Sequence, residues 1–140
     1  MKASESRYCS CMYFASSALA RKVEKLATTA WQPVNMSPSH GYLLLMVLDE
    51  PGIQPGALVA ELLLSPSTVT RLLDKLEGKK LVSRISSGKQ INVYPTQKAR
   101  SMQRQLKGCQ AEFYETYGRL FGKEETKKLV QTLNRLTDKL

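Results

Sequence analysis

The sequence has few of the residues that metal sites and disulfide frameworks require. Its 140 residues include one histidine, His40, and three cysteines, Cys9, Cys11 and Cys109. Three unevenly spaced cysteines are too few for a disulfide framework, and in a reducing compartment they are thiols by default. A Cys-X-Cys pair on a helix projects its thiols about 200° apart, which is poor geometry for one ion. We therefore expect no metal site and no cofactor.

Motifs of the common enzyme classes are also missing. The chain has no histidine–carboxylate cluster, no glycine-rich phosphate loop and no nucleophile motif, so we do not expect an enzyme. No apolar run approaches the ~20 residues that span a bilayer. Residues 18–20 (Ala-Leu-Ala) resemble an export cleavage site, but serines interrupt the apolar run before them and the helical pattern continues past them. The expectation is a cytoplasmic protein.

Acidic residues are scarce in one part of the chain. The whole sequence holds 21 basic and 12 acidic residues, a formal charge of +9. Residues 65–104 contain only Asp74 and Glu77 as acids and supply +7 of that charge. Their basic residues are Arg71, Lys75, Lys79, Lys80, Arg84, Lys89, Lys98, Arg100 and Arg104. So concentrated a charge predicts a polyanionic partner, either nucleic acid or an anionic membrane surface.

Two helical regions are predicted at the ends of the chain, over residues 4–30 and 96–140. Each carries apolar residues at steps of three and four, which place them on one face. Thr96 is a suitable N-cap for the second region, which turns at Gly122 into a last helix. Apolar stripes on terminal helices are readily buried against a second copy, which predicts a homodimer; packing within one chain is the alternative.

The middle of the chain, residues 37–95, has the pattern of a winged helix-turn-helix. Ser37-Pro38 opens a helix that ends at Leu48, a short helix covers residues 55–63, and Ser65-Pro66 opens a third helix that ends at Gly78. The period then changes to that of two short strands, 81–85 and 91–94, joined by a loop over 86–90. The fold class is therefore mainly α (α+β), with terminal helices forming a dimerisation region.

The helix from residue 66 to 78 has the properties of a DNA reader. Its apolar residues anchor one side, while short or forked hydrogen-bonding groups lie near its start, where a recognition helix approaches the bases. The hairpin adds cations that reach phosphates or the minor groove. The candidate DNA-binding residues are Ser67, Thr68, Thr70, Arg71, Lys75, Arg84 and Lys89. An ordinary amphipathic helix with a solvated polar face is the alternative interpretation.

The stretch from Leu58 to Ala99 resembles the MarR family of bacterial transcriptional regulators. The resemblance is carried by Ser67-Thr68-Val69-Thr70-Arg71, Asp74-Lys75-Leu76-Glu77, Leu81-Val82-Arg84 and Tyr94-Pro95-Thr96. It implies a single domain over residues 1–140 that binds double-stranded DNA as a homodimer on a palindromic operator, commonly as a repressor released by a small molecule or by oxidation. The family's wing tip is usually rich in Asp and Arg, whereas this chain has Ser86-Ser87-Gly88-Lys89, which predicts weaker contacts with phosphate.

Two kinds of signal are compatible with this resemblance. Cys9, Tyr13 and Ser16 are spaced as at the start of the organic hydroperoxide resistance regulators, in which a first-helix cysteine is oxidised. This makes Cys9 and Cys11 candidate redox sensors, although the tyrosines that support the thiol in that branch are replaced by residues 37–41 and Tyr42 is out of register. The family also implies an effector cleft. Its candidate lining residues are Tyr13, Trp31 and Tyr42, and plain core is the alternative for each.

The main rival function is protein binding, because winged helices also serve as interaction modules and the wing has few cations. Binding to an RNA duplex is not expected, since the major groove of A-form helices is too deep and narrow for a recognition helix.

Overall fold

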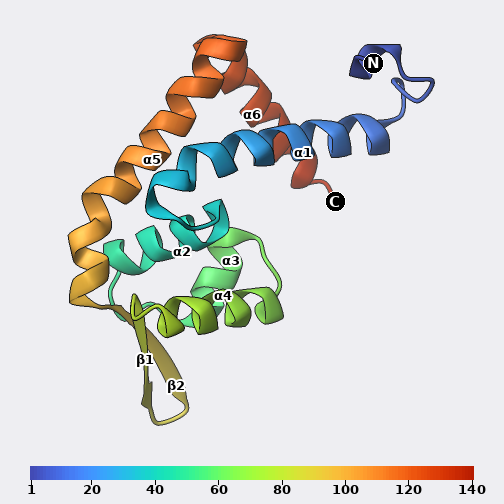
Figure 1. Ribbon diagram of the computed structural model, residues 1–140. Coiled ribbons are helices and arrows are strands. Elements are labelled where there is room, and N and C mark those ends of the chain that lie inside the picture. The colour runs from blue at the N-terminus through green and yellow to red at the C-terminus, as the bar shows by residue number, and fades with distance from the viewer.

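The computed structural model describes residues 1–140 and contains six α-helices and one hairpin. Three helices with the hairpin form a compact lobe, while α1, α5 and α6 extend from it as arms (Figure 1). The helices are α1 (Met12–Trp31), α2 (Pro38–Asp49), α3 (Pro55–Leu62), α4 (Pro66–Gly78), α5 (Gln97–Phe121) and α6 (Lys123–Thr137). Short 3₁₀ turns cover Ala3–Glu5 (η1) and Gln32–Val34 (η2). The predicted fold class is confirmed.

The first helix begins later than its apolar pattern predicts. We expected a helix over residues 4–30, but α1 starts at Met12, and the backbone of Cys11 before it is extended. The chain before Met12 is rich in serine, whose hydroxyl competes for backbone groups; Ser6 Oγ accepts a hydrogen bond from the Tyr8 amide. The Tyr8 ring stacks on Phe14 with centroids 4.8 Å apart, so this segment folds back on α1. Cys9 therefore lies in a turn rather than on a helix.

Hydroxyl caps and prolines set the starts of the other helices as predicted. The side chains of Ser37, Ser65 and Thr96 accept hydrogen bonds from the amides of the residues three positions on, which begin α2, α4 and α5. Proline stands in the first turn of α2, α3 and α4, where its missing N–H costs nothing. Helix α4 has the predicted bounds.

The hydrophobic core lies within the lobe, around α2. Leu43, Leu44 and Val47 of α2 are fully buried, together with Leu58 of α3 and Leu76 of α4. Trp31, at the end of α1, joins the same core and packs edge-on against Tyr42. The almost wholly apolar composition of α2 is thus explained by its central position, between α5 and α4.

Helices α3 and α4 form a helix-turn-helix. The chain turns by 114° between them, within the usual range for this motif. The turn passes through Leu63, which adopts a left-handed conformation with φ of 55° and is largely exposed. No single helix is long and apolar enough to cross a membrane; only α3 and α4 taken together, across this bend, meet the criteria of length and composition.

The hairpin is longer than predicted and has a tighter turn. Strands β1 (Val82–Ser87) and β2 (Gln90–Pro95) are antiparallel and pair from Val82 with Pro95 to Ser87 with Gln90. The loop is reduced to two residues, Gly88 and Lys89, and Gly88 has φ of 63°, which suits a type II′ turn. An unpredicted bridge between Ile53 and Val93 attaches the hairpin to the α2–α3 connection. These two residues lie far apart in sequence, so no local pattern indicates the bridge.

Candidate nucleic-acid interface

Helix α4 presents one apolar face to the core and one polar face to solvent. Val69, Leu73 and Leu76 are no more than 2% exposed and hold the helix against the lobe. Ser67 and Arg71 are exposed on the opposite face. Thirteen residues give the helix a length of about 20 Å. A major groove admits one α-helix, so this exposed face has the size and polarity to enter a duplex.

The beginning of α4 is a network of hydroxyl groups. Ser65 Oγ accepts from the amide of Thr68 at 3.2 Å and lies 2.8 Å from Thr68 Oγ1. The Arg71 guanidinium in turn donates to Thr68 Oγ1 at 3.4 Å. Thr68 is half-buried and belongs to the cap, so its hydroxyl orients Arg71 rather than standing free on the outer face. Arg71 keeps its other N–H groups available.

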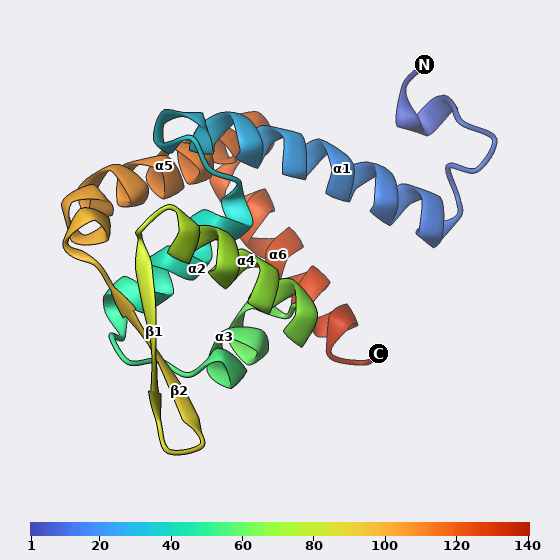
Figure 2. The same cartoon turned by 60° about the horizontal axis from the view of Figure 1, so that its bottom comes forward.

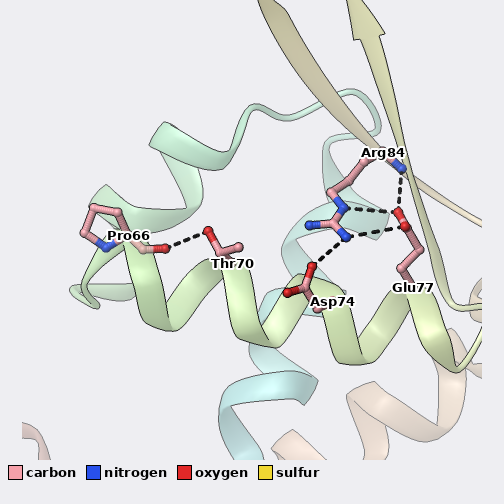
Figure 3. A network of polar contacts seen from close by, with 5 residues as sticks. All are labelled: Pro66, Thr70, Asp74, Glu77 and Arg84. Atoms are coloured by element: carbon pink, nitrogen blue, oxygen red, sulfur yellow. Dashed lines mark hydrogen bonds and ion pairs between the residues drawn. The ribbon is translucent and has the colours of Figure 1, made fainter.

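Thr70 is exposed, but its hydroxyl already donates to the carbonyl of Pro66 at 3.0 Å (Figure 3). The oxygen retains lone pairs, so Thr70 is suited to accept a hydrogen bond from a base amino group. Lys75 is exposed on the next turn and has no carboxylate partner. These two residues therefore complement Arg71 with an acceptor and a point charge.

Arg84 is held against the recognition helix. Its guanidinium lies 2.7 Å from Asp74 and 3.1 Å from Glu77, and its amide also donates to Glu77 (Figure 3). Hydrogen bonding to these carboxylates raises the pKa of Arg84, and the guanidinium lowers the pKa of Glu77. That Arg84 reaches phosphates or the minor groove stays a prediction; its observed contacts join the wing to α4. Asp74 and Glu77 are the residues that the prediction missed, since only the fold brings them to β1.

Lys89 is the single cation at the tip of the wing. Figure 1 shows the hairpin projecting from the lobe next to α4, with the tip as its most distant point. The side chains around it are serines and the exposed Ile85 and Ile91. The wing therefore projects from the lobe and carries little charge at its tip, as its sequence predicts.

The candidate sensor residues are not gathered in one place. Cys9 and Cys11 are exposed, whereas Cys109 is buried and burial raises its pKa. Trp31 and Tyr42 contact each other, but Tyr13 lies 18 residues earlier on α1, roughly 27 Å away along the helix. The structure thus brings together two of the three predicted effector residues.

Trp31 and Tyr42 lie where the lobe meets α5. Trp31 is completely buried, and its Nε1 has no hydrogen-bond partner. Burial is the largest cause of a raised pKa at Tyr42, and neighbouring Tyr114 of α5 raises it further. A buried N–H without a partner is rare in proteins.

The arms leave apolar side chains uncovered. Leu120 and Phe121 at the end of α5 are exposed, as are Met12 and Leu19 of α1. Helix α6 continues this surface with Leu129, Val130, Leu133 and Leu136, each 40–44% exposed. Packing within one chain leaves these stripes uncovered.

The lobe is similar in sequence to a known family, and the whole chain is similar in fold to known structures. Residues 34–90 match the MarR family model. A transcriptional repressor, CouR, bound to p-coumaroyl-CoA has 20% identity and a TM-score of 0.86, over 97% of this chain and 98% of that one. The same repressor bound to a 23-mer DNA duplex has a TM-score of 0.83 and 20% identity, over 98% of both chains. The S. aureus MepR–DNA complex has a TM-score of 0.79 and 17% identity, over 92% of this chain and 98% of that one. No curated protein matches the sequence.

Proposed function

We propose that the protein is a transcriptional regulator of the MarR type that binds double-stranded DNA sequence-specifically; the match of residues 34–90 to the MarR family model supports this. The observation that carries the proposal is the outer face of α4, where Arg71 is exposed, oriented by Thr68 and flanked by a wing that Arg84 holds in place. In this arrangement α4 enters the major groove and Lys89 reaches the phosphates beside it. Repression by occupying the operator is the simplest mode of action.

We further propose that the protein acts as a homodimer on a palindromic operator. The uncovered apolar stripes of α1, α5 and α6 support this, because they lie on the arms and away from α4 (Figure 1). Two copies joined through these arms place two recognition helices on one face of a duplex, related by a two-fold axis. We propose the domain assignment predicted from the sequence, in a cytoplasmic protein: residues 37–95 are the DNA-binding lobe, and residues 4–30 (helical from Met12 onward) and 96–140 form the dimerisation region.

A chemical signal is the proposed means of release. A small organic molecule is one candidate, supported by the contact between the candidate effector residues Trp31 and Tyr42 and by the ligand-bound state of a structural neighbour. An organic hydroperoxide is the other, supported by the exposure of Cys9 and Cys11. In this second case the thiolate of Cys9 or Cys11 attacks the O–O bond of the hydroperoxide. The sulfur is oxidised to a sulfenic acid and the corresponding alcohol leaves.

Protein binding is the second candidate function. The observation that favours it is the wing, which carries one cation at its tip and exposes Ile85 and Ile91. Ionic strength separates the two functions. Binding to a duplex weakens steeply with salt because each neutralised phosphate releases counterions, whereas an apolar protein interface responds much less.

Selection of bound duplexes from a random pool tests the proposed function. The purified full-length protein should enrich a consensus with two-fold symmetry, and the separation of its half-sites should be about one helical turn. Enrichment without a consensus would leave only non-specific binding by the basic surface. No enrichment at low salt would contradict the proposal and favour the protein-binding alternative.

A further inference from the structure

A concave surface lies on the flank of α4 that faces away from the wing. Its hollow of about 330 Å³ is open to solvent and is bordered by the end of α1, η2, the start of α2 and the C-terminal half of α4. Helices α2 and α4 are in contact, and Figure 2 shows α2 crossing behind α4. The hollow is lined by Thr28, Gln32, Asn35, Met36, Ser37, His40, Lys75 and Lys79. One of these residues is apolar and none is acidic, so we refer to the surface as the basic groove.

Two lysine charges converge in the basic groove without a counter-charge. Lys75 and Lys79 are one helical turn apart, and both lower the pKa of His40, although burial lowers it most. Neither lysine makes an ion pair; Lys79 Nζ reaches only the carbonyl oxygen of Asn35 at 3.4 Å. The acids of α4 lie on its other flank, where Arg84 binds them. The groove therefore has a positive potential that the protein itself does not neutralise.

The polar groups of the groove are mainly donors. His40 Nδ1 is hydrogen-bonded to Ser37 Oγ, which leaves Nε2 of the ring free. Gln32 is exposed and its amide has no partner, while the hydroxyl of Thr28 donates to the carbonyl of Glu24. Two ammonium groups, an imidazole and an amide together favour an anion with several acceptor oxygens. A phosphoryl group supplies three such oxygens and a charge of about −1.5 to −2, against two oxygens and one charge for a carboxylate.

We propose that the basic groove is a binding site for a phosphoryl group, held by Lys75, Lys79 and His40. Two sources provide this chemistry. One is a backbone phosphate of the duplex. A phosphate bound there would extend the DNA interface to the side of α4 opposite the wing, and this source rests on the proposed function. The other is a free phosphorylated metabolite, whose charge beside α4 repels the duplex and so couples metabolite to DNA binding.

The single histidine makes the groove directly observable. Imidazole resonances of His40 can be followed by NMR without assignment, while inorganic phosphate replaces chloride at constant ionic strength in the full-length protein. We expect a saturable rise in the pKa of His40, because a bound phosphate offsets the two lysine charges, the only other charged groups that line the groove. The variants Lys75→Gln and Lys79→Gln should each weaken phosphate binding by about tenfold.

Lys107→Gln is the matched control, since Lys107 is an exposed lysine of α5 outside the groove. It should bind phosphate as the wild type does. A His40 resonance that responds equally to phosphate and chloride, or a response that both groove variants retain in full, would overturn the proposal. Far-ultraviolet circular dichroism of each variant checks that the fold is retained.

The salt dependence of duplex binding distinguishes the two sources. If the groove holds a backbone phosphate, Lys79→Gln should reduce the slope of log affinity against log salt by about one for each phosphate lost. If it holds a metabolite, Lys79→Gln should leave that slope unchanged, and inorganic phosphate should release the duplex from the wild type but not from the variant. A His40 response to phosphate in a protein that binds no duplex would support the groove while contradicting the proposed function.

Discussion

The guanidinium of Arg84 in β1 lies 2.7 Å from the carboxylate of Asp74 in α4, and this contact joins the wing to the recognition helix. Glu77 adds a second carboxylate, so the planar guanidinium is bound by two acids one turn apart. The Arg84 side chain is only 25% exposed. The angle between wing and helix is therefore set by side-chain contacts as well as by the backbone turn between them.

Replacing Arg84 by Gln should release the wing with little effect on folding. We expect duplex affinity to fall about tenfold, while the free energy of unfolding changes by less than about 1 kcal/mol, as is usual for ion pairs near the surface. Arg84→Lys separates positioning from charge, because an ammonium cannot reproduce the fork. Affinity restored in full by lysine would show that Arg84 acts as a simple cation on phosphate.

The stability that Glu77 contributes should depend on pH. Its folded pKa is lowered from the ordinary 4.5 by Arg84, so the contribution is present above pH 4.5 and is lost as the pH falls through the folded value. Denaturant unfolding of the wild type and Glu77→Gln should therefore differ at neutral pH and converge in acid. Glu61→Gln, at an exposed glutamate without an ion pair, should match the wild type throughout. A constant difference between wild type and Glu77→Gln would contradict the assignment.

Gly41 is required by the packing of Trp31. A Cβ built at Gly41 overlaps the indole ring, which is fully buried and has no space to retreat. Gly41→Ala should lower the free energy of unfolding by about 1–3 kcal/mol. Gly56→Ala provides the control in another helix, where a Cβ meets no atom within 4 Å and the change should be neutral or stabilising by up to ~1 kcal/mol. Equal stability of the two variants would mean that Trp31 is loosely packed.

Oxidative release should depend on Cys9 or Cys11. Treatment with an organic hydroperoxide should dissociate the wild type from its selected duplex, and Cys9→Ser should remain bound. Cys109→Ser serves as the control because Cys109 is buried and its raised pKa disfavours the reactive thiolate. Equal release of wild type and Cys9→Ser would eliminate Cys9 as the sensor and leave Cys11 to be examined.

Local signals in the sequence account for most of the fold. Ser65-Pro66 marks the start of α4 and Gly78 its end, and the structure has the same bounds. The start of α1 was missed because the apolar period continues into residues 4–11, where serine hydroxyls and the Tyr8–Phe14 stack favour turns instead. Periodicity reports which residues can share a helix face; it does not report whether the helix forms.

The candidate site was less predictable than the fold, because it depends on contacts between distant segments. The exposure of Arg71 follows from the period of α4, but the binding of Arg84 by Asp74 and Glu77 depends on the path of β1. His40 illustrates the same limit. Its place in a groove with Lys75 and Lys79 requires the packing of α2 on α4, which no spacing in the sequence encodes.

The affinity of Arg71→Ala for the duplex selected by the wild type tests the central claim most directly. At fixed salt we predict a loss of ~1–3 kcal/mol of specific binding and a relaxed preference at the contacted base pair. If Arg71→Ala keeps both the affinity and the sequence preference of the wild type, the outer face of α4 does not read DNA.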